Sequence, residues 1–237
     1  RIDALRSSSH GNGQIGLGAL VTHRSLGSNA ELARSLPALA EACRTVGGWQ
    51  TQEVGTIAGN VANASPAADT VPPLLVAGAV VHLASAGGTR SQPIGDFLLG
   101  RRETTRQPDE LITSIDVEPV GERSGEVYLK VGPRSAMEVA MVGLAVRLAF
   151  GDDDQVADAR VAVCSVAPVP FRCVEAEGAL VGSSLDDEHV AEAGRLLAES
   201  ADPIDDPRAS AAYRKRILAP LLGRAIEICR ERAKGGT

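Results

Sequence analysis

Apolar and polar positions alternate most regularly in the second half of the chain, where the pattern predicts a β-hairpin. Every second residue from 142 to 150 is large and apolar, and smaller or polar residues stand between them. This period of two places the large side chains on one buried face of a strand. Residues 151–154 are typical of a solvated turn, after which Val156–Val166 can return as the partner strand. The alternating positions are Val142, Leu144, Val146, Leu148 and Phe150.

Three segments carry apolar residues at helical spacing. In the first, residues 36–46, Pro37 suits a first helical turn and the glycine pair that follows suits a helix stop. The second is Leu185–Glu199. The third runs from Ser210 to about Arg232, and Pro220 should kink or split it.

The first half of the chain mixes shorter signals of both kinds. Asp69 could cap a helix whose first turn contains Pro72 and Pro73. Gly87-Gly88-Thr89 lies between two strand candidates, so we expect a hairpin turn there. The expected strands are Gln14–Val21, Ala79–Ala84 and Leu111–Val117.

Polar, turn-rich stretches suggest where the chain divides. Residues 7–13, 119–126 and 202–208 are expected to be loops. With a boundary at the second of these, the sequence predicts an α+β protein of two domains, 1–120 and 126–237. The second domain is expected to be an antiparallel sheet with helices packed on it.

Composition and charge exclude several functional classes. The 237 residues are 44% hydrophobic and 23% charged, which is ordinary for a folded globular chain. The net charge of −6 argues against a broad nucleic-acid surface, which would need a basic face. No apolar run reaches about 18 residues, so we expect no membrane span.

The cysteines and histidines give no metal-site spacing. No C-x-x-C pair and no H-E-x-x-H motif occurs, so we expect neither a zinc site nor an iron–sulfur cage on this chain. The expected state of the thiols is reduced and buried, in a cytoplasmic protein. The four cysteines are Cys43, Cys164, Cys173 and Cys229.

Two glycine-rich segments compete as phosphate-binding candidates. Gly11-x-Gly13-x-x-Gly16 matches a dinucleotide fingerprint as a string, but the residues after it favour a strand instead of the helix that the fingerprint needs. Residues 55–70 (GTIAGNVANASPAADT) are nearly free of bulky side chains and carry short polar groups. Small residues let main-chain amides approach an anion closely. A tight structural turn leading into a helix is the alternative for this segment.

Residues 55–69 resemble the FAD-binding signature of the flavoprotein subunits of molybdenum hydroxylases, the medium subunits of carbon monoxide dehydrogenase and xanthine dehydrogenase-type enzymes. The resemblance extends over nearly the whole chain, and the order and spacing of its strings support it. The other matching strings are residues 15–22, 72–75, 77–79, 110–115, 128–130, 134, 166–172 and 205–210.

The resemblance implies an FAD-binding domain of the vanillyl-alcohol-oxidase-like type, followed by a flavoprotein C-terminal domain. In the family, electrons begin at a molybdenum cofactor on a large subunit and cross [2Fe-2S] clusters on a small subunit. They then pass through FAD to an external acceptor. The resemblance therefore implies partner subunits of both kinds and a dimer of heterotrimers, with no catalytic residue and no metal ligand on this chain.

Residue roles follow from the same resemblance. Residues 55–60 would meet the FAD diphosphate through main-chain amides and short side chains, with Ala62 in the contact zone. Ser65 and Asp69 would bind polar parts of the cofactor, Ile112 would pack on the isoalloxazine, and Lys130 would lie near the polar edge of the ring. The diphosphate residues are Gly55, Thr56, Ile57, Ala58, Gly59 and Asn60.

Plainer interpretations of these residues remain open. Lys130 could be an ordinary strand-end lysine, Ile112 plain core and Asp69 only a helix cap. The sole tryptophan, Trp49, is expected to be a packing residue.

Two departures from the family pattern bear on FAD binding. The family's earlier glycine-rich loop, which meets the diphosphate from the other side, has no counterpart here, so the FAD-binding domain is expected to be incomplete at its N-terminus. Ala58 stands where the family commonly has glycine, which is tolerable if its φ is negative.

The leading hypothesis is an FAD-binding electron-transfer subunit of a molybdenum hydroxylase. One alternative is a non-catalytic docking module that has lost FAD. Another is a stand-alone flavin oxidoreductase, which the absence of a recognisable substrate base or covalent flavin-linking residue disfavours.

Overall fold

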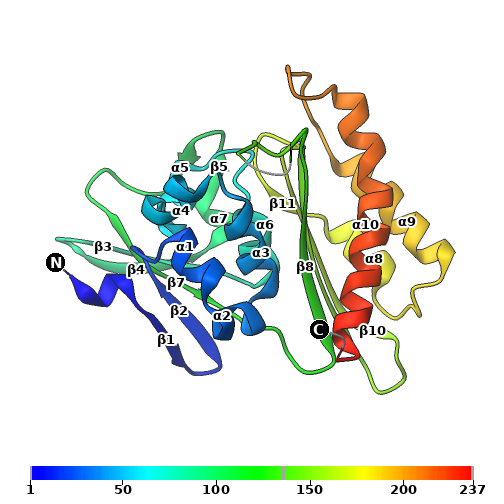
Figure 1. The fold of residues 1–237 in the computed structure, drawn as a ribbon, viewed down its shortest axis with the longest axis horizontal. Helices are drawn as coiled ribbons and strands as arrows, with labels where there is room; N and C mark the ends of the chain where they lie inside the picture. The colour runs from blue at the N-terminus through cyan, green and yellow to red at the C-terminus, as the bar shows by residue number, and fades with distance from the viewer. Residues whose placement is uncertain (1, 135–136, 236–237) are drawn as a thin grey trace.

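The structure, a computed structural model, describes residues 2–134 and 137–235. It stacks four layers in the order sheet, helices, sheet, helices (Figure 1). The predicted α+β class is therefore confirmed. The outer bounds of the two expected domains, residues 1 and 237, lie outside the described residues.

The first sheet has five strands in the order β1-β2-β7-β3-β4, and every neighbouring pair is antiparallel. In its middle, Ile115 pairs with Leu17 on one side and Val81 on the other, and all three side chains are buried. The strands are β1 (Ser8–Gly11), β2 (Gln14–Gly18), β3 (Val80–Ser85), β4 (Gly88–Pro93) and β7 (Leu111–Val117). The three predicted strands of this half are confirmed, with ends that differ by up to three residues.

The hairpin between β1 and β2 corrects the expectation of a loop at residues 7–13. Its turn is Asn12-Gly13, and both residues have positive φ, 52° and 75°. Asn-Gly favours this kind of two-residue hairpin turn. The glycine-rich string at 11–16 is thus part of a hairpin that leads into a strand, as its context indicated. The hairpin turn predicted at residues 87–89 is also present, between β3 and β4.

Short helices form the second layer. Helix α3 (Pro37–Thr45) begins with Pro37 in its first turn, and Gly47 follows its end with a φ of 51°, as predicted. The other elements of this region are η1 (Asp3–Arg6), α1 (His23–Ser28), α2 (Ala30–Ser35), α4 (Trp49–Val54), α5 (Ile57–Asn63), α6 (Val71–Val76), α7 (Ile94–Phe97), β5 (Leu98–Gly100) and β6 (Glu103–Thr104).

The second sheet is antiparallel, with the order β11-β10-β9-β8. The predicted hairpin is its centre, since β9 pairs with β10 along most of their length. The strands are β8 (Ser124–Val131), β9 (Val142–Phe150), β10 (Val156–Cys164) and β11 (Phe171–Arg172). Because β8 begins at Ser124, the end of the stretch expected to be a loop at 119–126 is strand.

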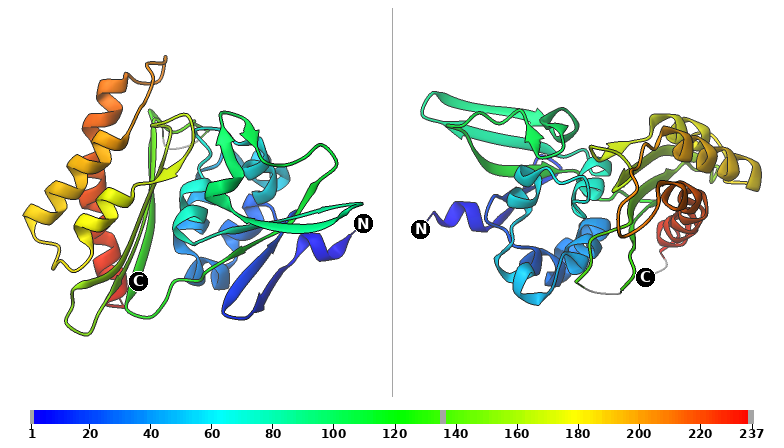
Figure 2. Two further views of the ribbon diagram at one scale, coloured as in Figure 1. Left: turned by 180° about the vertical axis from the view of Figure 1, so that it is seen from behind. Right: turned by 90° about the horizontal axis from the view of Figure 1, so that it is seen from above.

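Both faces of β9 are buried, which corrects the expectation of a single buried face. Gly143, Ala145 and Arg147 are buried as well as the large apolar residues between them, because α6 covers the second face of β9. The sheet therefore lies inside the molecule, with helices on each side (Figure 2).

Three helices form the fourth layer, α8 (Val174–Leu180), α9 (Asp187–Ser200) and α10 (Ala211–Ala233). Asp186 caps α9 and Ser210 caps α10 through their side-chain oxygens. Helix α10 runs unbroken through Pro220, so the expected splitting is wrong. None of the helices among the described residues is long and apolar enough to cross a membrane.

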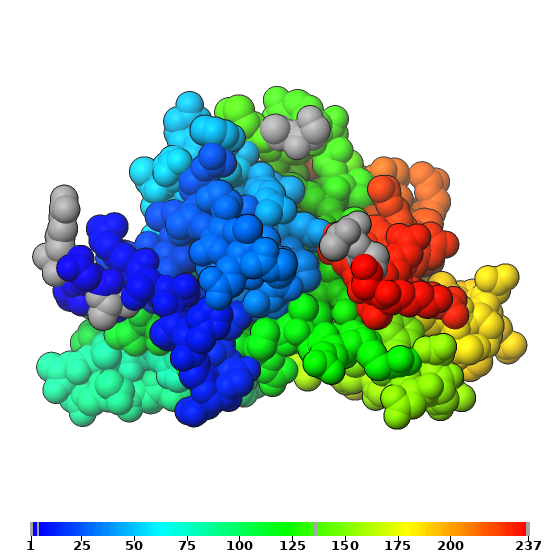
Figure 3. Space-filling model, turned by 60° about the horizontal axis from the view of Figure 1, so that its bottom comes forward, coloured from blue at the N-terminus to red at the C-terminus, as the bar shows by residue number. Residues whose placement is uncertain are grey.

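Polar contacts join the helical second layer to the inner sheet. Glu126 on β8 accepts a hydrogen bond from the Ala38 amide at the start of α3 and pairs with Arg147 on β9. Arg232 near the end of α10 pairs with Glu41 on α3 (2.6 Å). Figure 3 shows the face on which the blue helices around α3 approach the red end of α10.

Candidate cofactor site

The segment predicted to hold the diphosphate is a capped helix, not an open loop. Thr56 has extended backbone angles, and its Oγ1 accepts a hydrogen bond from the Gly59 amide (3.0 Å). This is the geometry of a helix N-cap, and α5 runs from there to Asn63. The helix ends at Ala64, which adopts a left-handed φ of 43°.

Most main-chain amides of residues 55–60 already have partners within the protein. The amides of Gly55, Ile57 and Asn60 donate to carbonyl oxygens at 2.7–3.0 Å, and that of Gly59 donates to the cap. The amides of Thr56 and Ala58 have no partner among the described residues. A ligand at this helix start would therefore find two free amides. Ala58 is not among the positive-φ residues, so its methyl group is compatible with the helix.

The outward face of α5 fits the close approach of a diphosphate. Gly59 and Ala62 are exposed there, whereas Ile57 and Ala58 point inward and are buried. A Cβ added at Gly59 would meet only the Thr56 hydroxyl, at 2.9 Å. No bulky side chain of α5 itself covers this face.

A buried histidine supports the backbone just before α5. The His23 amide donates to the Gly55 carbonyl (3.0 Å), and a Cβ at Gly55 would lie 3.0 Å from the His23 ring. Burial lowers the pKa of His23 to about 4, so the ring is neutral at pH 7. Its Nδ1 lies 3.8 Å from the Cys43 thiol, whose pKa burial raises.

Asp69 and Lys130 meet each other across the two halves of the chain. The Lys130 ammonium lies 2.8 Å from Asp69 Oδ2 and also donates to the Thr45 carbonyl (2.9 Å). The Tyr128 hydroxyl donates to Asp69 Oδ1 (2.6 Å). Burial raises the pKa of the Asp69 carboxyl, while the Lys130 charge acts in the opposite direction.

This cluster changes two interpretations of the sequence. Asp69 does not cap α6, because the N-cap is Thr70 and neither residue makes a side-chain cap bond. Lys130 is not an ordinary exposed strand-end lysine, because its side chain is 11% exposed and paired. Both residues tie the segment after α5 to β8.

The remaining candidates lie around these two groups. Asn60 Oδ1 accepts from the Thr70 hydroxyl (2.7 Å), and Ser65 Oγ accepts from the Ala67 amide (3.3 Å). Ile112 is only 9% exposed and belongs to the core between the first sheet and its helices. The plain-core interpretation of Ile112 therefore describes its position.

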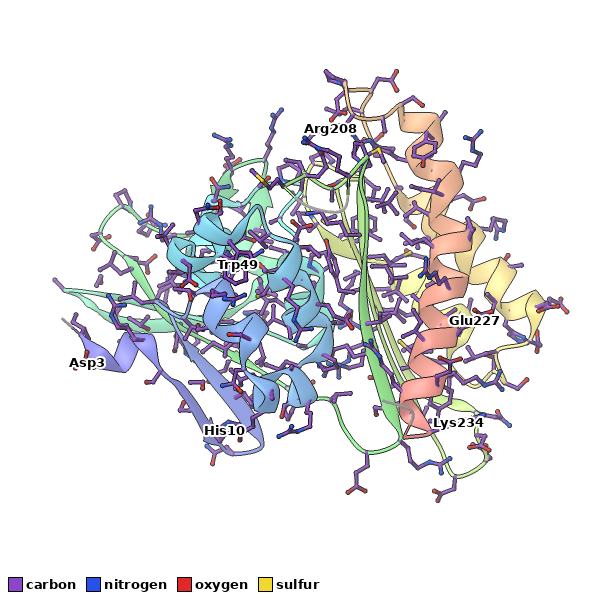
Figure 4. All side chains as sticks on the ribbon, in the orientation of Figure 1. Asp3, His10, Trp49, Arg208, Glu227 and Lys234 are labelled. Carbon is purple, nitrogen blue, oxygen red and sulfur yellow. The ribbon has the colours of Figure 1, made fainter. Side chains whose placement is uncertain are left out.

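Trp49 does not pack as expected. It stands at the start of α4 (Figure 4), is 64% exposed, and its ring is covered by the Arg24 guanidinium at 3.9 Å. Cation–π stacking of this kind accounts for its position on the surface.

Sequence reasoning missed two side chains of this region. Tyr128 appeared only as part of a matched string, and His23 was not singled out. No local signal marks either as a contact of Asp69 or Gly55, because 59 and 32 positions separate the members of each pair. Among the described residues, no three His, Cys, Asp or Glu side chains gather as a metal site.

Two family models match the chain. Residues 1–119 match a family described as the FAD binding domain in molybdopterin dehydrogenase. Residues 127–228 match the CO dehydrogenase flavoprotein C-terminal domain.

Individual relatives agree with these matches. The glyceraldehyde dehydrogenase medium chain of Sulfolobus acidocaldarius is 32% identical over 90% of this chain and 75% of its own length. The carbon monoxide dehydrogenase medium chain of Afipia carboxidovorans is 31% identical over 92% of this chain and 75% of its own. A solved carbon monoxide dehydrogenase from Hydrogenophaga pseudoflava superposes with a TM-score of 0.93 at 28% identity, covering 98% of this chain and 80% of that one.

Proposed function

The chain belongs to the family of FAD-binding medium subunits of molybdenum hydroxylases, and on this premise we propose that it relays electrons from iron–sulfur clusters of a partner subunit to an external acceptor. FAD, when bound, supplies the redox chemistry, and the protein supplies binding, orientation and electrostatics. The observation that carries the proposal is the exposed, small-residue face of α5 beside two free amides.

The diphosphate residues divide by role in this proposal. Thr56 and Ala58 offer amide donors. Gly59 and Ala62 carry no bulky side chain, so a charged group can approach the helix surface closely. Gly55, Ile57 and Asn60 hold the backbone in place, because their amides donate to carbonyl oxygens within the protein. A preorganised backbone spares a bound anion the cost of ordering its donors.

Lys130 is proposed to face the polar edge of the isoalloxazine as a hydrogen-bond donor. Its pairing with Asp69 removes most of the net charge that a free ammonium would bring. Two of its three N–H groups are used by Asp69 and Thr45, which leaves one for the cofactor. Ser65, and Ile112 through its small exposed surface, complete the proposed contacts.

The assembly is proposed from the relatives. Names such as medium chain and FAD-binding subunit place those proteins in multi-subunit enzymes. We propose a large subunit with the molybdenum cofactor, a small [2Fe-2S] subunit and a dimer of heterotrimers, working in the cytoplasm. Residues 1–120 would form the FAD-binding domain and residues 126–237 the flavoprotein C-terminal domain.

Reconstitution tests the proposal. The purified chain is titrated with FAD and followed by its visible spectrum, and the large and small subunits with the reducing substrate are then added without oxygen. We expect a bound yellow chromophore that bleaches only when both partners are present. Bleaching by substrate without partners would indicate a stand-alone oxidoreductase. A colourless chain that still joins the partners would indicate a docking module, and both results would overturn the proposal.

A further inference from the structure

Alternate residues of β8 contact α3, which lies beside this strand (Figure 1). Glu126 accepts a hydrogen bond from a main-chain amide at the start of the helix (3.0 Å), and the Lys130 ammonium donates to the Thr45 carbonyl at its end (2.9 Å). Between these two contacts, the Tyr128 amide donates to the Glu41 carboxylate (2.8 Å). The main chain of β8 is therefore fixed against the helix at Tyr128 and on both sides of it.

The Tyr128 hydroxyl occupies a space that only glycine leaves open. Tyr128 is 4% exposed, and its side chain reaches Gly143 on the neighbouring strand β9. A Cβ added at Gly143 would lie 2.5 Å from Tyr128 Oη and 2.6 Å from Cys164 Sγ, closer than packed atoms approach one another. A larger residue at position 143 would displace the hydroxyl, so its place is set by the sheet.

The Tyr128 hydroxyl is a hydrogen-bond donor to a buried carboxylate. Burial raises the pKa of Tyr128 well above its usual value, so the hydroxyl keeps its proton at pH 7. It lies 2.6 Å from Asp69 Oδ1, while Lys130 lies 2.8 Å from Oδ2. The Asp69 side chain is only 9% exposed. Phenylalanine at position 128 would leave Oδ1 of this carboxylate without its donor.

Tyr128 and Lys130 share the negative charge of Asp69. Burial raises the pKa of Asp69, whereas Lys130 and the Tyr128 hydroxyl lower it. Hydrogen bonds in such a chain polarise one another, and a donor on Oδ1 draws negative charge away from Oδ2. The Lys130 ammonium therefore faces a weaker negative charge than it would without the hydroxyl, and it remains a stronger donor toward any further group.

We propose that Tyr128 is a positioning residue for the flavin, which acts through Asp69 on Lys130. The inference rests on the proposed function, in which Lys130 faces the polar edge of the isoalloxazine. Reduction places negative charge on that edge, and a stronger donor stabilises the reduced form more than the oxidised form. The Tyr128 hydroxyl thereby raises the reduction potential of bound FAD.

Potentiometric titration of the FAD-loaded full chain tests the proposal. Tyr128→Phe keeps the ring and removes the donor. At a fixed potential near the wild-type midpoint, the ratio of reduced to oxidised flavin should fall by about tenfold, a downward shift of about 30 mV for a two-electron couple. Tyr213→Phe removes the hydroxyl of the second of the two tyrosines, which stands on α10 beside Arg216, and should leave the potential unchanged. An unchanged or raised potential in Tyr128→Phe, or equal shifts in both variants, would overturn the proposal.

A second measurement does not depend on the folding of the phenylalanine variant. In the Tyr213→Phe background Tyr128 is the sole tyrosine, so 3-fluorotyrosine supplied during expression labels this position alone. Fluorine withdraws electrons from the ring and makes the hydroxyl a stronger donor. The flavin potential should therefore shift upward, opposite to the effect of Tyr128→Phe. A downward shift, or none, would overturn the role of Tyr128.

The wild-type chain separates this proposal from the proposed function. If it binds FAD and bleaches only with both partners, while Tyr128→Phe keeps the wild-type potential, the role of Tyr128 alone is overturned. Bleaching without the partners would overturn the proposed function and leave the comparison of potentials valid. A wild-type chain that binds no FAD would overturn both.

Discussion

At the scale of single residues, small size and burial determine what the candidate site can do. Gly59 and Ala62 leave the outer face of α5 without bulky side chains, while the Thr56 hydroxyl caps the helix. The buried Asp69 carboxylate is satisfied by Tyr128 and Lys130. Each of these residues contributes through the contact it makes or the space it leaves open.

Gly59→Val should reduce FAD affinity by at least about tenfold, because a branched side chain on the exposed face of α5 would hold the diphosphate away. The measurement is FAD titration by visible absorbance. Gly178→Val, on α8 where a Cβ would meet nothing within 4 Å, is the control and should bind FAD normally. Undiminished affinity in Gly59→Val would contradict the placement of the diphosphate.

His23 should make stability depend on pH. Its folded pKa of about 4 lies below its unfolded value of 6.5, so the unfolded chain binds more protons between these values. Stability is therefore complete above about pH 6.5 and falls by about 3 kcal/mol as the pH is lowered to about 4. The measurement is urea unfolding across this range.

His23→Gln is the matched variant for this pH dependence. It removes the titrating group, so the difference in unfolding free energy between wild type and variant should change through this window and stay level above it. A difference that stays constant from pH 7 to pH 4 would show that His23 is not the group responsible.

At the scale of elements, local sequence signals and tertiary packing together determine where turns and helices form. Asn12-Gly13 forms a hairpin, and Pro37 starts α3, as their backbone preferences dictate. Pro220 behaves differently, since α10 continues through it. The helix buries Leu218 and Leu222 on either side of that proline against the inner sheet and α9, and this packing outweighs the local penalty.

Pro220→Ala should stabilise the protein by about 1–3 kcal/mol, because alanine restores a main-chain donor and removes the ring clash inside the helix. Thermal and urea unfolding measure the change. Gly223→Ala, one turn further along α10, should give a smaller gain of about 1 kcal/mol, since its Cβ would make ordinary contact with Val190. Destabilisation by Pro220→Ala alone would mean that the packing of α10 requires a bend at the proline.

At the scale of the whole molecule, the inner sheet joins the two halves. One face of this sheet contributes Tyr128, Ala145 and Ala162 to the core of the first half. The other face packs on α8–α10. The Glu126–Arg147 pair lies at this junction and holds the start of α3. The candidate site is assembled from residues of the two halves, because Asp69 of the first half pairs with Lys130 of the second.

Glu126→Gln should destabilise the protein by about 3–5 kcal/mol, because it leaves the buried Arg147 guanidinium without its counter-charge. Chemical denaturation measures this loss. Glu192→Gln breaks an exposed pair on α9 and should leave stability unchanged within error. Similar small effects of both changes would show that the buried pair does not hold the junction.

Much of the architecture follows from the sequence alone. The hairpin of β9 and β10 was predictable from its period-two pattern, and α3 from its helical spacing and terminal signals, because such patterns act between residues close in the chain. The small-residue character of residues 55–70 suggested phosphate binding, which stays a prediction, and the helical form of α5 was missed. Helix α5 is only seven residues long, too short for a clear period.

Only the tertiary structure decided which distant residues meet. Positions far apart in sequence meet in three places. Asp69 pairs with Lys130, and His23 supports Gly55. Arg101 and Arg214 line the same cleft. Packing the inner sheet between two helical layers brings these residues together. A linear pattern records which face a residue prefers, whereas the partner it finds there depends on how the layers are stacked.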